Sequence, residues 1–307
     1  MVAATALALA LVVAATAGAG GAAKLKGTIT SDGSSTVGPW TTAAAEFYRK
    51  VQPDVRITVG ISGTGGGFER FCRGEIDLSN ASRPIRSSEY ATCRQNGVKW
   101  VAFTVANDGI SLVASRQNTW VDCLTTSELR RIWNTGSNVD NWRDVRPGFP
   151  DVPLRLFGPG TDSGTFDFFT EAINGRARAS RSDYTASEDD NVLVQGVSGT
   201  RGGLGYFGLS YYLENQSRLK LIKVDAGGGC VAPSVASVQS RRYKPLSRGL
   251  FIYAKRDSFT RAPVRSFIGF AMNNQARIAR AADFVALTPA QAKRARYHYS
   301  TVLKQVR

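Results

Sequence analysis

The sequence contains very little histidine. Its single histidine, His298, lies in a C-terminal basic segment far in sequence from every hydroxyl-rich turn. Catalysis by a Ser-His pair requires a histidine beside the serine, and the serine elbow G-x-S-x-G does not occur. One histidine also cannot supply the histidine and carboxylate cluster that holds a catalytic metal. These absences argue against serine hydrolases and against metal-dependent hydrolases.

Long apolar runs are also absent beyond the N-terminus. The run from Ala3 to Ala17 is short and rich in alanine for a membrane span, and the small residues up to Ala23 suit cleavage by signal peptidase before Lys24. We therefore expect residues 1–23 to be a signal peptide or its remnant, and the mature chain to be periplasmic or extracellular. No Lys or Arg precedes the run, which leaves room for a start further upstream, and no cysteine is present there for a lipoprotein-type anchor.

Cysteine is scarce, and its spacing matches no metal site. The four cysteines are Cys72, Cys93, Cys123 and Cys230. In an exported protein, an even number of cysteines without metal-type spacing indicates two disulfides. The residues alone leave all three pairings open.

A concentrated basic tract is absent despite the net charge of +15. Local clusters occur only at Lys293 to Arg296 and at Arg241–Arg242, and the Trp and Tyr residues show no recurring pattern with basic residues. Scattered charge argues against a dedicated groove for a polyanion. We therefore expect no nucleic acid partner, whereas small anions remain compatible with this charge.

What the sequence does contain is a repeated order of strand, glycine- and hydroxyl-rich turn, and helix. The apolar segment Leu154 to Phe157 precedes the turn Gly158 to Thr165, and similar turns occur at Ser31 to Thr36 and Ser62 to Gly67. Free backbone N–H groups at a helix start favour anions, and Ser and Thr add donors without charge. One Ser-Gly-Thr alone is more often a simple helix cap. The repetition predicts an open α/β sheet that binds an anion at its carboxyl edge.

The remaining segments continue an α/β pattern in a chain long enough for two hydrophobic cores. We expect strands at Val98 to Val105 and Ile110 to Ser115, separated by a turn. The segment Thr125 to Glu128 predicts a capping box at the start of a helix. The polar segment Asn134 to Pro150, which includes Trp142, is expected to be a surface loop.

Six segments, in order along the mature chain, resemble motifs of the PstS-type phosphate-binding proteins of ABC transporters. They are Gly33–Thr36, Gly63–Gly66, Ile76–Pro84, Asp162–Thr165, Leu204–Leu213 and Pro245–Arg248. The resemblance implies a two-lobed α/β periplasmic-binding-protein fold of type II, in which each lobe is a mixed sheet flanked by helices and the ligand lies in the cleft between them. It also implies inorganic phosphate as ligand, an ABC-transporter permease as membrane partner, a monomer, no cofactor and no enzymatic activity.

The resemblance further implies the lobe boundaries. Lobe I would be discontinuous and contain residues 24–106 plus 249–307, and lobe II would contain residues 107–248. If each disulfide stays within one lobe, Cys72 pairs with Cys93, and Cys123 pairs with Cys230.

Transferred residue by residue, the family's phosphate contacts fall on Ser35, Thr36, Thr64, Ser163, Gly164 and Thr165. Two positions depart from the best-known family pattern. Ser82 stands where some members place an Asp, and Pro159 stands where they place an Arg. We expect the neighbouring Arg83 to supply the missing guanidinium, which suits a tetrahedral oxyanion through paired hydrogen bonds. Its alternative role is that of a surface cation before Pro84.

Selection of phosphate over sulfate requires an acceptor for the proton that phosphate keeps near neutral pH. Ser82 alone would discriminate poorly, because a hydroxyl can also donate. We expect Asp162 to be the acceptor, with helix capping as its alternative role. Asp32, beside Gly33, is the second choice.

Other functions remain open at this stage. A binding protein for another tetrahedral oxyanion, such as sulfate, would use the same turns. An exported phosphate-ester hydrolase is disfavoured by the single histidine. An adhesive or structural exported protein would explain the N-terminus and the cysteines but not the repeated anion-binding turns.

Overall fold

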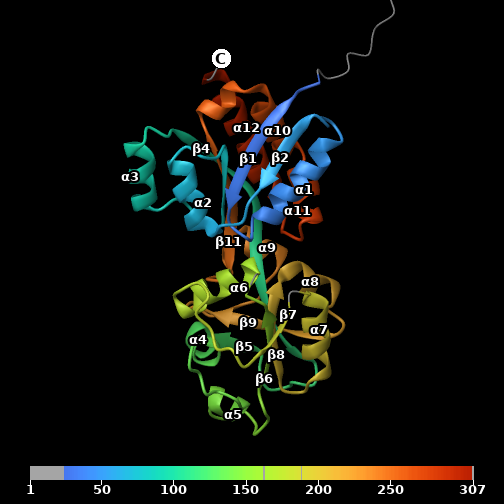
Figure 1. Ribbon diagram of the computed structural model, residues 1–307. Helices are drawn as coiled ribbons and strands as arrows, with labels where there is room; N and C mark the ends of the chain where they lie inside the picture. The colour runs from blue at the N-terminus through green and yellow to red at the C-terminus, as the bar shows by residue number, and fades with distance from the viewer. Residues whose placement is uncertain (1–23, 162, 188, 306–307) are drawn as a thin grey trace, which may run out of the picture.

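The computed structural model describes residues 24–161, 163–187 and 189–305. The chain forms two α/β bodies, one above the other in Figure 1, which are joined by the long strands β4 (Trp100–Ser115) and β11 (Ser247–Lys255). The segment 1–23, expected to be a signal peptide, lies outside the described residues. Within the described ranges, no helix has both the length and the apolar character needed to cross a membrane.

The upper body contains a mixed sheet in the order β2-β1-β3-β11-β4. In it β1 is parallel to β2 and β3, whereas β11 is antiparallel to β3 and β4. Besides β4 and β11, its elements are β1 (Gly27–Gly33), α1 (Gly38–Arg49), β2 (Val55–Val59), α2 (Gly63–Cys72), β3 (Leu78–Ala81), α3 (Ser87–Gln95), η2 (Asp257–Thr260), α10 (Ala262–Asn273), α11 (Gln275–Ala281) and α12 (Pro289–Gln305). The three parallel strands therefore end at one common edge.

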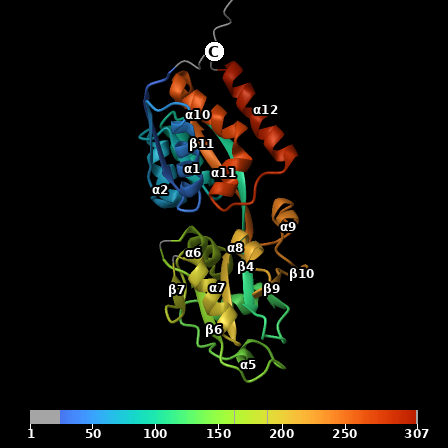
Figure 2. The same cartoon turned by 90° about the vertical axis from the view of Figure 1, so that its right-hand side faces the viewer.

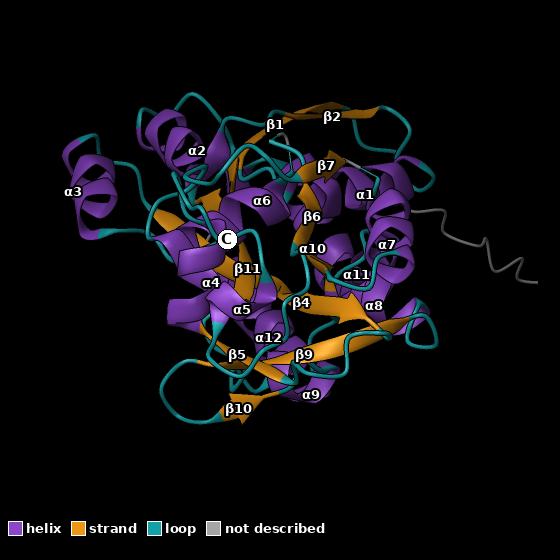
Figure 3. Ribbon diagram, turned by 90° about the horizontal axis from the view of Figure 1, so that it is seen from below, coloured by secondary structure: helices purple, strands orange, loops and turns teal. Residues whose placement is uncertain are grey.

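The lower body continues the sheet as β4-β8-β6-β7, and β9 pairs with β4, β5 and β10. Its elements are β5 (Cys123–Thr125), α4 (Thr126–Trp133), α5 (Trp142–Val145), β6 (Arg155–Pro159), α6 (Gly164–Phe169), η1 (Thr170–Asn174), β7 (Thr185–Ser187), α7 (Asp190–Gly199), β8 (Gly203–Gly208), α8 (Leu209–Glu214), β9 (Leu219–Asp225), β10 (Cys230–Val231) and α9 (Val235–Gln239). Figure 3 shows β5, β9 and β10 together at one side of this body. The helix α6 follows β6, as the strand-turn-helix pattern predicted.

Strand β4 is continuous over 16 residues. The expectation of two strands separated by a turn was wrong, because long-range pairing keeps the polar residues between them in the ladder: residues 107–109 pair with residues 247–249 of β11. From Ile110 onward, β4 pairs with β8 and β9 instead. One strand therefore belongs to both bodies, and Figure 2 shows it passing from one to the other.

Each body has its own buried apolar side chains. Those of the upper body come from residues 29–106 and 250–302, and those of the lower body come from residues 110–246. Trp142 is fully buried in the lower body, where its indole N–H donates to the Gly202 carbonyl at 2.9 Å. The interpretation of residues 134–150 as only a surface loop was therefore wrong, because an aromatic side chain anchors the segment in the core.

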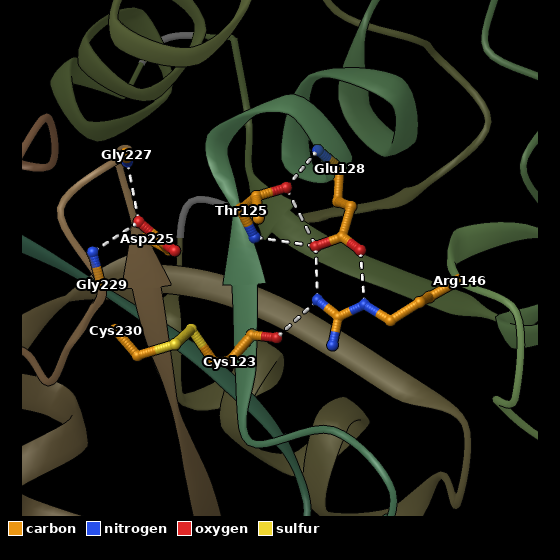
Figure 4. Close-up of a disulfide and its surroundings, with 8 residues drawn as sticks. All are labelled: Cys123, Thr125, Glu128, Arg146, Asp225, Gly227, Gly229 and Cys230. Carbon is orange, nitrogen blue, oxygen red and sulfur yellow. Dashed lines mark hydrogen bonds and ion pairs between the residues drawn. A yellow bond between two sulfur atoms is a disulfide. The ribbon is translucent and has the colours of Figure 1, made fainter.

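Both predicted disulfides are confirmed. Cys72–Cys93 joins α2 to α3, and Cys123–Cys230 joins β5 to β10. Figure 4 shows that the turn before Cys230 is organised by Asp225, whose carboxylate accepts hydrogen bonds from the backbone N–H groups of residues 227 and 229 at 2.7 and 3.0 Å. The long loop that the second bridge closes thus ends in an ordered turn.

The predicted capping box beside Cys123 is also confirmed. The Thr125 hydroxyl accepts from the Glu128 N–H at 3.1 Å, and the Glu128 carboxylate accepts from the Thr125 N–H at 2.8 Å (Figure 4). Arg146 donates to both oxygens of the same carboxylate at 2.7 Å, and to the Cys123 carbonyl at 3.1 Å. These contacts fix the start of α4 against β5.

Candidate functional site

A cavity of about 260 Å³ lies between the two bodies. Its upper wall contains Ser34, Ser35, Thr36, Gly63, Thr64, Gly65, Ser82, Arg83 and Arg86; its lower wall contains Asp167, Phe168, Glu171 and Ala177; and Arg248 enters from β11. A larger cavity of about 640 Å³ beside α12 contains none of the predicted site residues. The smaller cavity is therefore the candidate site, and we refer to it as the cleft cavity.

The carboxyl ends of three parallel strands form the upper wall. The turn after β1 carries Ser35 and Thr36, the turn after β2 leads to Thr64 at the start of α2, and β3 is followed by Ser82. The hydroxyls of Thr64 and Ser82 are 3.1 Å apart, and Thr64 also accepts from the Ser82 N–H at 3.3 Å. Of the three predicted turns, Ser31–Thr36 and Ser62–Gly67 therefore meet at one sheet edge, whereas Gly158–Thr165 belongs to the lower body.

A close backbone contact holds α2 against this edge. A Cβ atom at Gly67 would lie only 2.5 Å from the Gly33 Cα, so a larger side chain would push the start of α2 away from β1. Neither α1 nor α2 has a side-chain cap at its N-terminus. At α1 the Gly38 N–H already donates to the Ser34 carbonyl and Pro39 has no N–H, so it is the first N–H groups of α2 that retain the capacity to donate to a ligand at the edge of the cavity.

The Ser-Gly-Thr segment lies beside the cleft cavity and does not line it. The Ser163 hydroxyl accepts from the Thr165 N–H at 3.1 Å and so caps α6. The Gly164 carbonyl accepts from the Thr36 hydroxyl at 3.1 Å, which brings the two bodies into direct contact. Asp162, the predicted proton acceptor, lies outside the described residues.

Arg83 lines the cavity, but its guanidinium is already engaged. It donates to the two carboxylate oxygens of Glu89 at 2.9 and 2.8 Å. Asp32, the second choice for the acceptor, does not line the cavity. Its carboxylate accepts from the Gly33 N–H at 2.7 Å and forms an ion pair with Arg70, so its hydrogen-bonding capacity serves the β1 edge.

Sequence reasoning missed Arg248 as a site residue. It donates to the Thr36 hydroxyl at 2.7 Å, pairs with Asp108 at 3.2 Å, and lies 3.7 Å over the Phe168 ring. Its side chain is 13% exposed and that of Asp108 is 8% exposed. Burial lowers the pKa of Arg248, and the Asp108 carboxylate opposes this shift. Arg248 thus contacts the upper body, the lower body and the crossing strand β4 at one point.

Asp167 was also missed. It lines the cavity from α6, and one of its carboxylate oxygens, Oδ1, is buried without a hydrogen-bond partner. Burial raises the pKa of Asp167, although the positive charges of Arg178 and Arg248 partly offset this effect. An unsatisfied acceptor in a cavity costs free energy unless a ligand completes it. The signal in the sequence was one acidic residue within an otherwise apolar run, Phe166 to Phe169.

An ion pair spans the opening of the cavity. Arg86, at the start of α3, lies 3.2 Å from Glu171 in η1, and the two side chains are 59% and 43% exposed. Both residues line the cleft cavity. A contact at this place joins the two bodies, and separation of the bodies would break it.

Known proteins match this architecture. A family model described as a PBP superfamily domain matches residues 17–275. Protein SphX from Synechococcus elongatus is 48% identical over 267 residues, which cover 86% of this chain and 78% of the relative. Phosphate-binding protein PstS from Staphylococcus saprophyticus is 37% identical over 268 residues, which cover 86% of this chain and 82% of the relative.

Solved structures agree. A possible phosphate binding protein from Planctomyces limnophilus matches with a TM-score of 0.88 and 44% identity, covering 91% of this chain and 100% of that chain. An ABC-type phosphate transport receptor from Vibrio cholerae has a TM-score of 0.69 at 22% identity, covering 85% of this chain and 100% of that chain. The predicted two-lobed fold is confirmed. The chain therefore belongs to the PBP superfamily and, within it, to the PstS-type phosphate-binding proteins.

Proposed function

We propose that this protein captures inorganic phosphate in the cleft cavity and delivers it to the permease of an ABC transporter. One observation carries the proposal: hydroxyl side chains, the uncapped start of α2, the largely buried Arg248 guanidinium and a carboxylate with one buried, unpartnered oxygen converge on one small cavity. Neutral donors and a held arginine suit a small tetrahedral oxyanion. The family comprises substrate-binding proteins, and its named relatives include phosphate-binding proteins.

In this proposal, donors from both bodies surround the phosphate. The upper body supplies Ser35, Thr36, Thr64, Ser82 and Arg83, and the lower body supplies Ser163, Gly164 and Thr165 from the segment whose Gly164 carbonyl already contacts Thr36. Arg248 supplies the main guanidinium: Asp108 accepts from its Nε, which leaves the terminal nitrogens for a ligand, whereas Glu89 accepts from both terminal nitrogens of Arg83. The interaction of Arg248 with Asp108 limits its net charge, so hydrogen-bond geometry contributes more to ligand choice than charge alone.

Asp167 is the proposed proton acceptor. Its unpartnered Oδ1 can accept the P–OH proton that phosphate keeps near neutral pH, whereas sulfate would leave two lone-pair acceptors facing each other. Asp162, the acceptor expected from the sequence, remains an alternative. The observation that favours Asp167 is its place in the lining of the cavity.

Phosphate held from both sides would favour closure of the two bodies. A ligand that contacts both walls binds the closed state better than the open state and so shifts the population toward closure. We assign lobe I to residues 24–106 plus 249–307 and lobe II to residues 107–248, with β4 and β11 as the hinge. Small-angle scattering should show a smaller radius of gyration after phosphate is added. An unchanged profile with binding confirmed would count against the hinge.

Isothermal titration calorimetry with phosphate and with sulfate tests the binding function. We expect one phosphate per chain and weak or no heat with sulfate; tight sulfate binding without phosphate binding would assign the other oxyanion. Incubation with a chromogenic phosphate ester tests the hydrolase alternative, and we expect no turnover. We also propose that the protein acts outside the cytoplasmic membrane and is a monomer. Light scattering on the purified protein would check the monomeric state.

A further inference from the structure

A second pocket lies on the upper body, at the end of α3 and the start of β4. It has a volume of about 430 Å³ and is lined by Tyr90, Arg94, Gly97, Val98, Lys99, Trp100 and Arg256. None of these residues lines the cleft cavity. Figure 1 shows α3 projecting from the side of the upper body. We refer to these seven residues as the aromatic-basic pocket.

The pocket gathers three cations and no acidic residue. Arg94 comes from α3, Lys99 precedes β4, and Arg256 follows β11. Tertiary folding brings the last two together, since the Arg256 N–H donates to the Lys99 carbonyl at 2.8 Å. Among the described residues, none of the three forms an ion pair; the Arg256 guanidinium donates only to the neutral amide of Gln305.

The cleft cavity cannot account for the net charge of +15. Each of its three guanidinium groups is already paired with a carboxylate: Arg83 with Glu89, Arg86 with Glu171 and Arg248 with Asp108. The excess positive charge therefore lies elsewhere on the molecule, and in the aromatic-basic pocket three cations lie together without an acidic partner.

Aromatic rings form the apolar part of the pocket. Tyr90 is 52% exposed, so about half of its ring surface is accessible to a ligand. Its ring meets the edge of Trp100 at a centroid distance of 6.4 Å, and Trp100 packs in turn on Tyr253 at 5.0 Å. The residue that α3 buries is Cys93, which a disulfide fixes to α2.

We propose that the aromatic-basic pocket binds an acidic polysaccharide. Carboxylate or sulfate groups of such a chain would pair with Arg94, Lys99 and Arg256, and the apolar face of a sugar ring would pack on Tyr90 and Trp100. A polymer fits better than a single small anion, because the cations come from three separate segments around an open pocket. Although charge is scattered along the sequence, the fold collects it here.

The test uses immobilised polygalacturonate and the full chain. The variant Arg94→Gln/Lys99→Gln removes two cations of the pocket, and Arg49→Gln/Lys50→Gln at the end of α1 makes the same change of net charge outside it. We expect the pocket variant to bind about 5- to 30-fold more weakly than wild type at low salt, and the control to change by less than about twofold. Tyr90→Ser should weaken binding without altering net charge.

Phosphate titration of each variant should give the wild-type Kd, which confirms that the fold is intact. Equal losses in the pocket and control variants would mean that only net charge matters, and this would overturn the proposal. So would an absence of binding by wild type, equal binding of neutral dextran, or tighter binding of single-stranded DNA than of polygalacturonate.

Discussion

Removal of the Arg248 guanidinium tests the proposed phosphate site most directly. The substitution Arg248→Met leaves the Asp108 carboxylate, 8% exposed, without its cation, and we expect a loss of about 3–5 kcal/mol in unfolding free energy. It also removes a charged donor from the cleft cavity. A hydrogen bond to a charged group contributes about 1.5–3 kcal/mol, which corresponds to an increase of about 10- to 150-fold in the phosphate Kd.

The double variant Asp108→Asn/Arg248→Met separates stability from binding. Because no buried charge then remains unpaired, most of the lost stability should return, whereas phosphate affinity should stay low. Urea unfolding followed by circular dichroism measures the first quantity, and isothermal titration calorimetry measures the second.

Arg181 offers a matched control. Its side chain is 6% exposed and forms an ion pair with Asp183, but it does not line the cleft cavity. Arg181→Met should therefore lower stability without changing the phosphate Kd. If the double variant at Asp108 and Arg248 binds phosphate as tightly as wild type, Arg248 is not the cation of the site and the reasoning is refuted.

Three further predictions concern selectivity, stability and release. Asp167→Asn should remove the preference for phosphate over sulfate in competition titrations. Burial raises the pKa of Asp167, so the charged carboxylate destabilises the folded state above that pKa. The Asn variant should therefore have a higher melting temperature than wild type at neutral pH without ligand. In wild type, sulfate should compete better with phosphate as the pH falls through the raised pKa. The Cys123–Cys230 bridge has a sequence separation of 107, and its loss should lower the unfolding free energy by up to about 5 kcal/mol. The preference for phosphate over sulfate should stay intact. An unchanged melting temperature with verified free thiols would contradict the predicted loss of stability. Arg86→Glu should speed phosphate release about twofold to fivefold in stopped-flow experiments, because it replaces the ion pair with Glu171 by two like charges. The charge swap Arg86→Glu/Glu171→Arg should restore the wild-type release rate. Release from the swapped variant as fast as from the single variant would exclude a role for the pair.

Short-range patterns predicted the turns that form the upper wall of the cleft cavity, and the family resemblance then singled out individual residues within them. Ser35, Thr36 and Thr64 follow strands or begin helices whose limits are marked by nearby glycine, proline and apolar residues. Parallel strands place such turns at one edge, so their convergence followed from the sequence. The family resemblance added the disulfide pairing, which spacing alone left open.

Contacts between distant segments could not be predicted in the same way. Arg248 meets Thr36 across 212 positions of sequence, and no local pattern specifies that contact. Strand β4 was misjudged for the same reason: Asn, Asp and Gly at positions 107–109 favour a turn locally, but the ladder with β11 outweighs that preference. Asp167 was overlooked because its importance depends on burial, which only the packed structure reveals.

The position of β11 between β3 and β4 has a consequence for the order of assembly during synthesis. The strands β1 to β3 emerge first, but their sheet lacks its central partner until residue 255 has been made, and the helices α10 to α12 that complete the same core come later still. The lower body is drawn from one contiguous stretch, residues 110–246, and can mature as soon as that stretch is available. The middle of the chain is thus able to fold before its beginning. Until the C-terminal segment arrives, the edge of β3 that later receives β11 has unpaired backbone groups and is open to pairing with another strand.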